Sequence, residues 1–213
     1  ESLQIMERIN LISPNAVKYL SDVSNINMSI GQLYMLKGEP SNTLDYYENA
    51  LEIGTSICEQ YPDNIYYQVA LSEIFVKYGQ YYQTLKDFEK AVDYYNTCRD
   101  YRIAIHNELP GDLSHMHNLS QIEILLGDAY LELKKNEKAL DSFSRAVELC
   151  STIHDIEKGD YNFLRTYIVS SFKLGACIMH KNNVKGYEKL NNPEDYPDLL
   201  KAKMLLEEFS SRN

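Results

Sequence analysis

A regular internal repeat constrains the fold of this chain more than any other feature of its sequence. Gly31, Gly79, Gly127 and Gly175 recur at every forty-eighth position, and they make up four of the nine glycines. Other identical residues keep the same interval: Pro14, Pro62 and Pro110; Ser24, Ser72 and Ser120; Tyr34, Tyr82 and Tyr130; Asp45, Asp93 and Asp141. A fixed period of this length is typical of proteins built from one repeated supersecondary unit.

Apolar residues within each repeat recur three and four positions apart, as Val23, Ile26 and Ile30 do in the first. This is the period of an α-helix, whereas a half-buried strand alternates with a period of two. Pro62, in the segment 59–64, cannot continue a helix but suits a turn or a first helical position. Each repeat is therefore predicted to be a hairpin of two antiparallel helices, each about 20 residues and about 30 Å long.

The expected helix bounds follow the repeat. The first helix of each hairpin should begin soon after Pro14, Pro62 or Pro110 and extend to about Lys37, Lys86 or Lys135. The second helix should begin near Ser41, Phe88 or Glu137 and end before the next Pro or Gly.

Glycine within these helices needs a packing reason, because it costs about 1 kcal/mol relative to Ala in a helix interior. We expect the repeated glycines to face small residues of the second helix, which lets the two helices approach to about 8 Å. The small residues at these places are Thr43, Ala91 and Ala139 and, further along, Ala50, Cys98 and Ala146. Aromatic residues should fill the wider gaps: Tyr47, Tyr95 and Phe143, and Tyr34, Tyr82 and Tyr130.

The order of these residues resembles the tetratricopeptide repeat. The third repeat shows the pattern best, with Leu126-Gly127, Tyr130, Ala139, Phe143 and Ala146. The equivalent residues are Ile30-Gly31, Tyr34, Thr43, Tyr47 and Ala50 in the first repeat, and Tyr78-Gly79, Tyr82, Ala91, Tyr95 and Cys98 in the second. The usual repeat is shorter, at about 34 residues. The present one therefore resembles the extended-helix variants of some large bacterial multidomain proteins.

The resemblance implies an all-α fold, an α-solenoid of stacked antiparallel helical hairpins that winds as a right-handed superhelix. We expect a single domain over residues 1–213. The expected parts are repeats at about 14–61, 62–109, 110–157 and 158–180, a loop over 181–196, and a capping helix over 197–210. The fourth repeat departs from the pattern, because Ile178 takes the tyrosine place and Tyr187 stands where a small residue belongs.

Composition excludes several classes of function. The 213 residues are 44% apolar, which is enough to bury a core, and no apolar run reaches the about 18 residues of a membrane-spanning helix. The net charge of −10 and the lack of a basic stripe argue against nucleic-acid binding. The four cysteines lie far apart with no C-x-x-C pair, and no secretory signal is visible, so a cytoplasmic location is expected.

Catalytic and cofactor motifs are also missing. The phosphate-binding glycine-rich strings, the H-E-x-x-H zinc motif and the G-x-S-x-G nucleophile motif do not occur. His115 and His117 would point about 160° apart on a helix, so they are expected to be surface histidines rather than ligands of a shared metal. We therefore expect no enzymatic activity, no cofactor and no metal in this segment.

The family implies a concave face, lined by the first helices, on which an extended or helical peptide lies. The groove positions that the resemblance implies are Asn25, Met28, Gln32 and Met35; Glu73, Val76, Gln80 and Gln83; Gln121, Ile124, Asp128 and Leu131; and Val169, Phe172 and Ala176. Gln can donate to and accept from a peptide backbone, and Met adapts to varied surfaces.

Alternatives stay open for these positions. The recurring apolar residues Met28, Val76, Ile124 and Phe172 fit core between repeats as well as groove lining. The polar ones, Gln32, Gln80 and Asp128, are better groove candidates, although they can equally face water. Some related domains bind the carboxylates of a ligand with Lys and Asn at particular groove positions, but neither residue occurs at those positions here. Asp128 and Glu73 instead favour a neutral or basic ligand.

The interpretation that follows is a protein–protein interaction scaffold that binds a peptide or protein partner in the groove. Two alternatives remain: a regulatory or sensor segment of a larger enzyme, and a self-association module that forms a homo-oligomer. Because the sequence starts at Glu1 rather than Met, we expect it to be part of a longer chain.

Overall fold

A computed structural model describes residues 16–181 of the chain, together with 197, 200, 201, 203–205 and 207. These residues form α-helices joined by short turns, and no β-strand occurs among them, so the predicted all-α class is confirmed. None of the described helices is long and apolar enough to span a bilayer. The chain divides into two units, residues 1–101 and 102–213, which are treated separately below.

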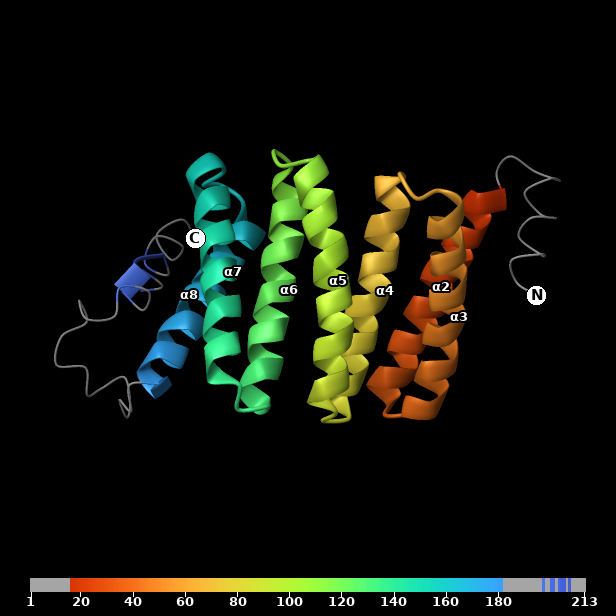
Figure 1. The fold of residues 1–213 in the computed structure, drawn as a ribbon, viewed down its shortest axis with the longest axis horizontal. Helices are drawn as coiled ribbons and strands as arrows, with labels where there is room; N and C mark the ends of the chain where they lie inside the picture. Colours follow the sequence, from red (N-terminus) through yellow and green to blue (C-terminus); the bar gives the residue numbers. More distant parts are fainter. Residues whose placement is uncertain (1–15, 182–196, 198–199, 202, 206, 208–213) are drawn as a thin grey trace. The chain divides into compact units, whose positions relative to one another are not determined.

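Unit 1 is built on the hairpin of α2 (Ala16–Lys37) and α3 (Pro40–Gln60), against which α4 (Ile65–Thr84) packs (Figure 1). The helix α5 (Phe88–Glu108) begins in this unit, and its residues from Arg102 onward belong to unit 2. The core joins Tyr47 and Ala50 of α3 to Leu71, Ile74 and Tyr78 of α4. Unit 1 is therefore a stack of helices that share one apolar core.

Unit 2 contains the hairpin of α6 (Leu113–Glu132) and α7 (Asn136–Ile156), and α8 (Tyr161–Lys181) packs on both. The described residues between 197 and 207 are helical, and Leu205 among them is buried against Cys150, Leu164 and Tyr167. The predicted loop from residue 182 onward, Tyr187, and the rest of the predicted capping helix lie outside the described residues.

The predicted helix starts are confirmed within one residue, because α3, α5 and α7 begin at Pro40, Phe88 and Asn136. Side chains at the turns explain several starts. Asn64 accepts a hydrogen bond from the Tyr67 amide at 3.4 Å, and Asp112 accepts from the amides of Ser114 and His115 at 2.8 and 3.1 Å. The second helices end before Pro62, Pro110 and Gly159, as predicted. Pro14 lies outside the described residues.

The predicted ends of two first helices are wrong, since α4 ends at Thr84 and α6 at Glu132, before Lys86 and Lys135. Lys86 and Lys134 adopt left-handed backbone angles, with φ of 62° and 58°, which stop the helix. Gly38 occupies the equivalent place in the first repeat with φ of 76°. The capping bonds recur with it: the amides of Glu39, Asp87 and Lys135 donate to the carbonyls of Tyr34, Tyr82 and Tyr130.

The side chains nearest to the repeated glycines are aromatic rings. A Cβ atom on Gly127 would overlap the ring of Phe143, and one on Gly79 would overlap the ring of Tyr95. Gly31 is placed in the same way against Tyr47, and it also approaches the Thr43 carbonyl. The small residues of the second helices are fully buried: Thr43, Ala50, Ala91, Cys98, Ala139 and Ala146.

Gly127→Ala should lower the free energy of unfolding by about 1–2 kcal/mol. The added methyl group must displace the buried Phe143 ring, and this overpacking exceeds the about 1 kcal/mol that Ala contributes through helix propensity. Urea-induced unfolding followed by circular dichroism measures the change. Gly111→Ala is the control, because a Cβ there meets nothing within 4 Å. Equal unfolding midpoints for the two variants would contradict the proposed contact.

Lys134→Gly should raise the free energy of unfolding by up to about 1 kcal/mol. A left-handed conformation costs an L-residue about 1–2 kcal/mol, part of which is offset because Gly loses more backbone entropy on folding. Glu148→Gly, inside α7, should instead destabilise the protein by about 0.5–1 kcal/mol. Thermal unfolding of both variants beside the parent checks these opposite signs.

Candidate partner-binding surfaces

The predicted groove residues of unit 1 divide between its core and its surface. Val76 is buried, while Met28 and Met35 are half-buried and pack against the core cluster of this unit. Asn25 borders a void of only about 10 Å³, which has room for no more than a water molecule. The apolar members of the predicted groove in unit 1 therefore serve mainly as packing residues.

Polar members of the same set stay accessible. Gln32 on α2 is exposed, and Glu73, Gln80 and Gln83 on α4 are half-buried. The carboxamide oxygen of Gln83 accepts a hydrogen bond from the Tyr95 hydroxyl at 2.7 Å, which ties the end of α4 to α5. Gln83 thus supports the fold, whereas Gln32 is exposed and Gln80 remains partly accessible.

Unit 2 brings three predicted residues, Asp128, Leu131 and Phe172, to the wall of one hollow of about 670 Å³ between α6 and α8. Ala176, from the same groove register, also lines it. Of the others, Ile124 is buried, and Gln121 and Val169 are exposed outside the hollow. Sequence reasoning missed four further lining residues: Lys134, Asn136, Lys173 and Cys177.

An ion pair crosses this hollow. The Lys173 ammonium group donates a hydrogen bond to Asp128 Oδ1 at 2.6 Å, and both side chains are about one-third exposed. The pairing neutralises Asp128, which sequence reasoning took as an attraction for a basic ligand. Beside it, Phe172 is 56% exposed and Leu131 is 37% exposed. The hollow therefore offers an accessible apolar surface next to a fixed, internally neutralised polar pair.

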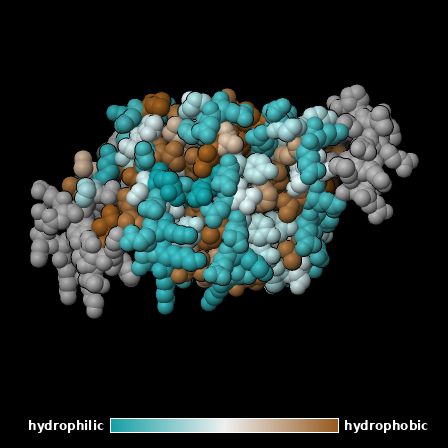
Figure 2. Space-filling view, in the orientation of Figure 1, coloured by the Kyte–Doolittle hydropathy of each residue, from teal (hydrophilic) through white to brown (hydrophobic). Residues whose placement is uncertain are grey.

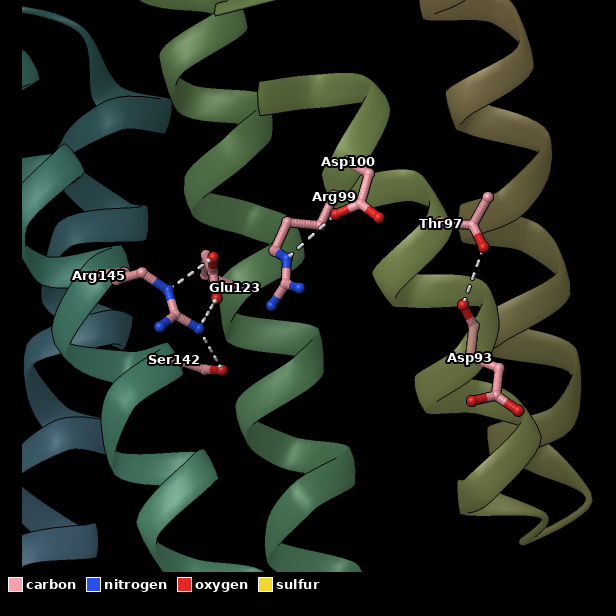
Figure 3. Close-up of polar contacts among 7 residues, drawn as sticks. All are labelled: Asp93, Thr97, Arg99, Asp100, Glu123, Ser142 and Arg145. Atoms are coloured by element: carbon pink, nitrogen blue, oxygen red, sulfur yellow. Dashed lines mark hydrogen bonds and ion pairs between the residues drawn. The ribbon is translucent and has the colours of Figure 1, made fainter. Parts of the chain in front are cut away.

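A buried carboxylate holds α6 against α7 close to this region. Glu123 on α6, whose side chain is 3% exposed, accepts two hydrogen bonds from Arg145 of α7 at 2.9 and 3.0 Å (Figure 3). Arg145 also donates to the Ser142 hydroxyl at 3.2 Å. The hydrogen bonds to Glu123 raise the pKa of the Arg145 guanidinium above its usual value. Because Arg145 reaches both carboxylate oxygens of Glu123, with its Nε and one Nη, the pair fixes the orientation of the two helices.

The family model of the tetratricopeptide repeat matches residues 72–99 and 124–152. The chain contains tetratricopeptide repeats. The matched segments run from α4 into α5 and from α6 into α7, so each spans parts of the first and second helices of one hairpin. No curated protein sequence matches the chain.

Two solved structures share the fold at low sequence identity. The apo form of RapI is 16% identical over 83% of this chain, with a TM-score of 0.58, and the chain spans 42% of the length of RapI. BtubC from P. vanneervenii is also 16% identical, covers 98% of this chain and 82% of its own length, and has a TM-score of 0.53. These likenesses show that the fold is that of a helical-repeat solenoid.

The first helix of the first repeat, α2, exposes a face that its equivalents bury. Ile26 on α2 is 56% exposed, whereas Ile74 and Ile122, one and two repeats later, are at most 1% exposed. Val23 and Leu33 on α2 are exposed in the same way. In the space-filling view, hydrophobic residues reach the surface in patches between hydrophilic side chains (Figure 2). Exposed apolar side chains are thus distributed over the repeats rather than confined to the hollow in unit 2.

His117 is not the surface histidine that was predicted. Its Nε2 atom lies 2.8 Å from the Thr166 hydroxyl of α8, and its ring meets Phe163 edge-on at a centroid distance of 4.9 Å. Because the Thr166 hydroxyl donates to the Asn162 carbonyl, Nε2 is assigned as the donor to Thr166. Within the described ranges, no group of three or more His, Cys, Asp or Glu is arranged to hold a metal.

Burial lowers the pKa of His117 below its usual value of 6.5, with a smaller contribution from Arg102, while Asp160 acts in the opposite direction. The folded state therefore favours the neutral ring. Below a pH of about 6.5 the unfolded chain takes up a proton that the folded chain resists, so stability falls as the pH falls through this range.

Replacing His117 with Gln should reduce the loss of stability between pH 7 and pH 5. The parent loses the contribution of the neutral imidazole in this range, and Gln has no proton to gain. Urea unfolding at several pH values measures the difference in slope, which separates His117 from the carboxylates common to both proteins. His115→Gln serves as the comparison. A parent and a His117→Gln variant with parallel pH profiles would refute the assignment.

Proposed function

We propose that this chain is a non-catalytic interaction scaffold that holds a peptide segment of a partner protein in the hollow between α6 and α8. The observation that carries the proposal is the meeting of Asp128, Leu131 and Phe172 in one accessible hollow of about 670 Å³. The tetratricopeptide repeats support an interaction role in general terms. The four buried cysteines, none of them in a disulfide, support a location in the cytoplasm.

Physical chemistry favours a neutral segment with one large apolar side chain. Covering the exposed rings and methyl groups of Phe172 and Leu131 is favourable by about 25 cal/mol for each Å² removed from water. Asp128 attracts a cation only weakly, because Lys173 already neutralises it. Asn136, at the start of α7, can donate to and accept from the backbone of the bound segment.

The accessible glutamines of the predicted groove complete the proposal. Gln121 on α6 would contact the same partner, and Gln32 and Gln80 would contact a partner that reaches unit 1. Their carboxamides suit a peptide backbone because each can donate and accept at once. The apolar residues Val76 and Ile124 are left out, since their burial gives a partner little to contact.

Phe172→Ser should weaken peptide binding about tenfold or more without lowering the melting temperature, because its side chain is exposed in the folded protein. Peptides selected on the immobilised chain from a random library provide the probes, and fluorescence anisotropy measures their affinity. Ile156→Ser is the matched control, since Ile156 is at least as exposed as Phe172 but lies outside the hollow.

The peptide affinities of these two variants show whether the peptide binds in the hollow between α6 and α8. Binding that survives Phe172→Ser and is lost with Ile156→Ser would place the peptide elsewhere. Binding that survives both substitutions would remove the hollow from the proposal.

A further inference from the structure

Three glutamates lie along one side of α3 in unit 1. Glu48, Glu52 and Glu59 are all exposed, and none of them forms an ion pair within the part of the chain that the structure describes. The row is peculiar to this repeat. The equivalent residues are Asn96, Asp100 and Asn107 in the next repeat, and Ser144, Glu148 and Asp155 in the one after it.

The stability of α3 does not explain the row. Like charges four residues apart, as at Glu48 and Glu52, destabilise a helix by about 0.2–0.5 kcal/mol. Glu59 lies in the last turn, where an anion opposes the helix dipole by about 0.3–1 kcal/mol, and that turn has no basic residue to offset it. The three carboxylates therefore act against the helix that carries them.

The same glutamates border a hollow of about 420 Å³, whose other lining residues are Leu51, Thr55, Ser56 and Tyr78. Ser56 is an independent sign of a missing occupant. It is only 7% exposed, and its hydroxyl has no hydrogen-bond partner among the described residues. A buried hydroxyl without a partner costs about 1–3 kcal/mol, which a ligand that bonds to it would remove.

The negative charge of the glutamate row affects the pKa of neighbouring tyrosines. Burial raises the pKa of Tyr78 above its usual range, and the phenol of Tyr94 and the carboxylate of Glu48 raise it further. Glu48 also contributes to the raised pKa of Tyr94, after burial and the contact with Tyr82. Burial is the main reason that these phenols stay neutral, and the negative charge of Glu48, which adds to the effect, also attracts a cation to the hollow.

The spacing of the three glutamates along α3 favours an extended peptide over a single metal ion as the ligand. Glu48 and Glu59 are separated along α3 by about 16 Å at about 1.5 Å per residue. No set of three or more metal-ligating side chains within the described ranges is close enough to surround an ion. An extended peptide can instead place successive basic side chains at separate carboxylates. The methylene stems of Lys or Arg suit the apolar wall formed by Leu51 and Tyr78.

We propose that the hollow on α3 binds a basic, extended segment of a partner protein. Its Lys or Arg side chains pair with Glu48, Glu52 and Glu59, and one polar group of the segment bonds to the Ser56 hydroxyl. This surface lies in unit 1 and carries the opposite preference to the hollow between α6 and α8, so it stands or falls independently of the peptide site in unit 2.

The test uses the full chain and a fluorescein-labelled octapeptide of alternating Arg and Ser, with a Glu and Ser peptide as the negative probe. Combining Glu48→Gln, Glu52→Gln and Glu59→Gln should weaken binding of the Arg peptide about tenfold or more, measured by anisotropy at two salt concentrations. The control combines Glu132→Gln, Glu148→Gln and Asp155→Asn, which remove the same charge from unit 2. It should change the affinity less than about twofold.

Equal losses for the two triple variants would show attraction by net charge alone and would overturn the proposal. Equal binding of the Arg and Glu peptides to the parent would also overturn it. If the first triple variant loses its helical circular dichroism, Glu52→Gln against Glu148→Gln gives the same comparison at register-equivalent positions.

Ser56→Ala separates a binding role from a structural one. It removes the hydroxyl that lacks a partner, so the melting temperature should stay unchanged or rise while the affinity for the Arg peptide falls about two- to fivefold. Unchanged affinity would remove Ser56 from the site. A lower melting temperature with unchanged affinity would mark the hydroxyl as part of the fold alone.

Discussion

The contact between a helix glycine and an aromatic ring is the constraint on which each hairpin depends. Gly31, Gly79 and Gly127 leave space for the rings of Tyr47, Tyr95 and Phe143, and a single methyl group would fill that space. Because the ring lies where a Cβ would be, the two helices of each hairpin can pack closely at this point.

Residues that break the repeat carry the features proposed here for function. The bonds between Glu123 and Arg145 and the ion pair between Asp128 and Lys173 have no counterpart at the equivalent positions of the first two repeats. The glutamate row on α3 is also confined to one repeat. Repetition therefore determines the scaffold, while departures from it distinguish one surface from another.

Much of the scaffold was predictable because local signals agree with the global fold. The constant interval between repeats, the helical spacing of apolar residues and the turn prolines identified the hairpins and the starts of their helices. The ends of α4 and α6 were missed, since a lysine gives no local sign of a left-handed conformation; the available signal was Gly38 at the equivalent place in the first repeat. The hollow in unit 2 was found only in part. Lys173 and Asp128 are 45 residues apart in the sequence. Their ion pair depends on the tertiary fold, so the sequence alone did not reveal that Asp128 is neutralised.

Lys134 combines a left-handed backbone conformation with a side chain at a candidate binding surface. Its backbone is strained where Gly38 is relaxed, and its side chain reaches the wall of the hollow between α6 and α8. Glycine at this position would relax the backbone but would remove one of the two lysines that line the hollow. Lysine at this position lowers the stability of the fold slightly and supplies a charged group at the rim of the hollow. Strained residues are commonly found near binding surfaces for this kind of reason.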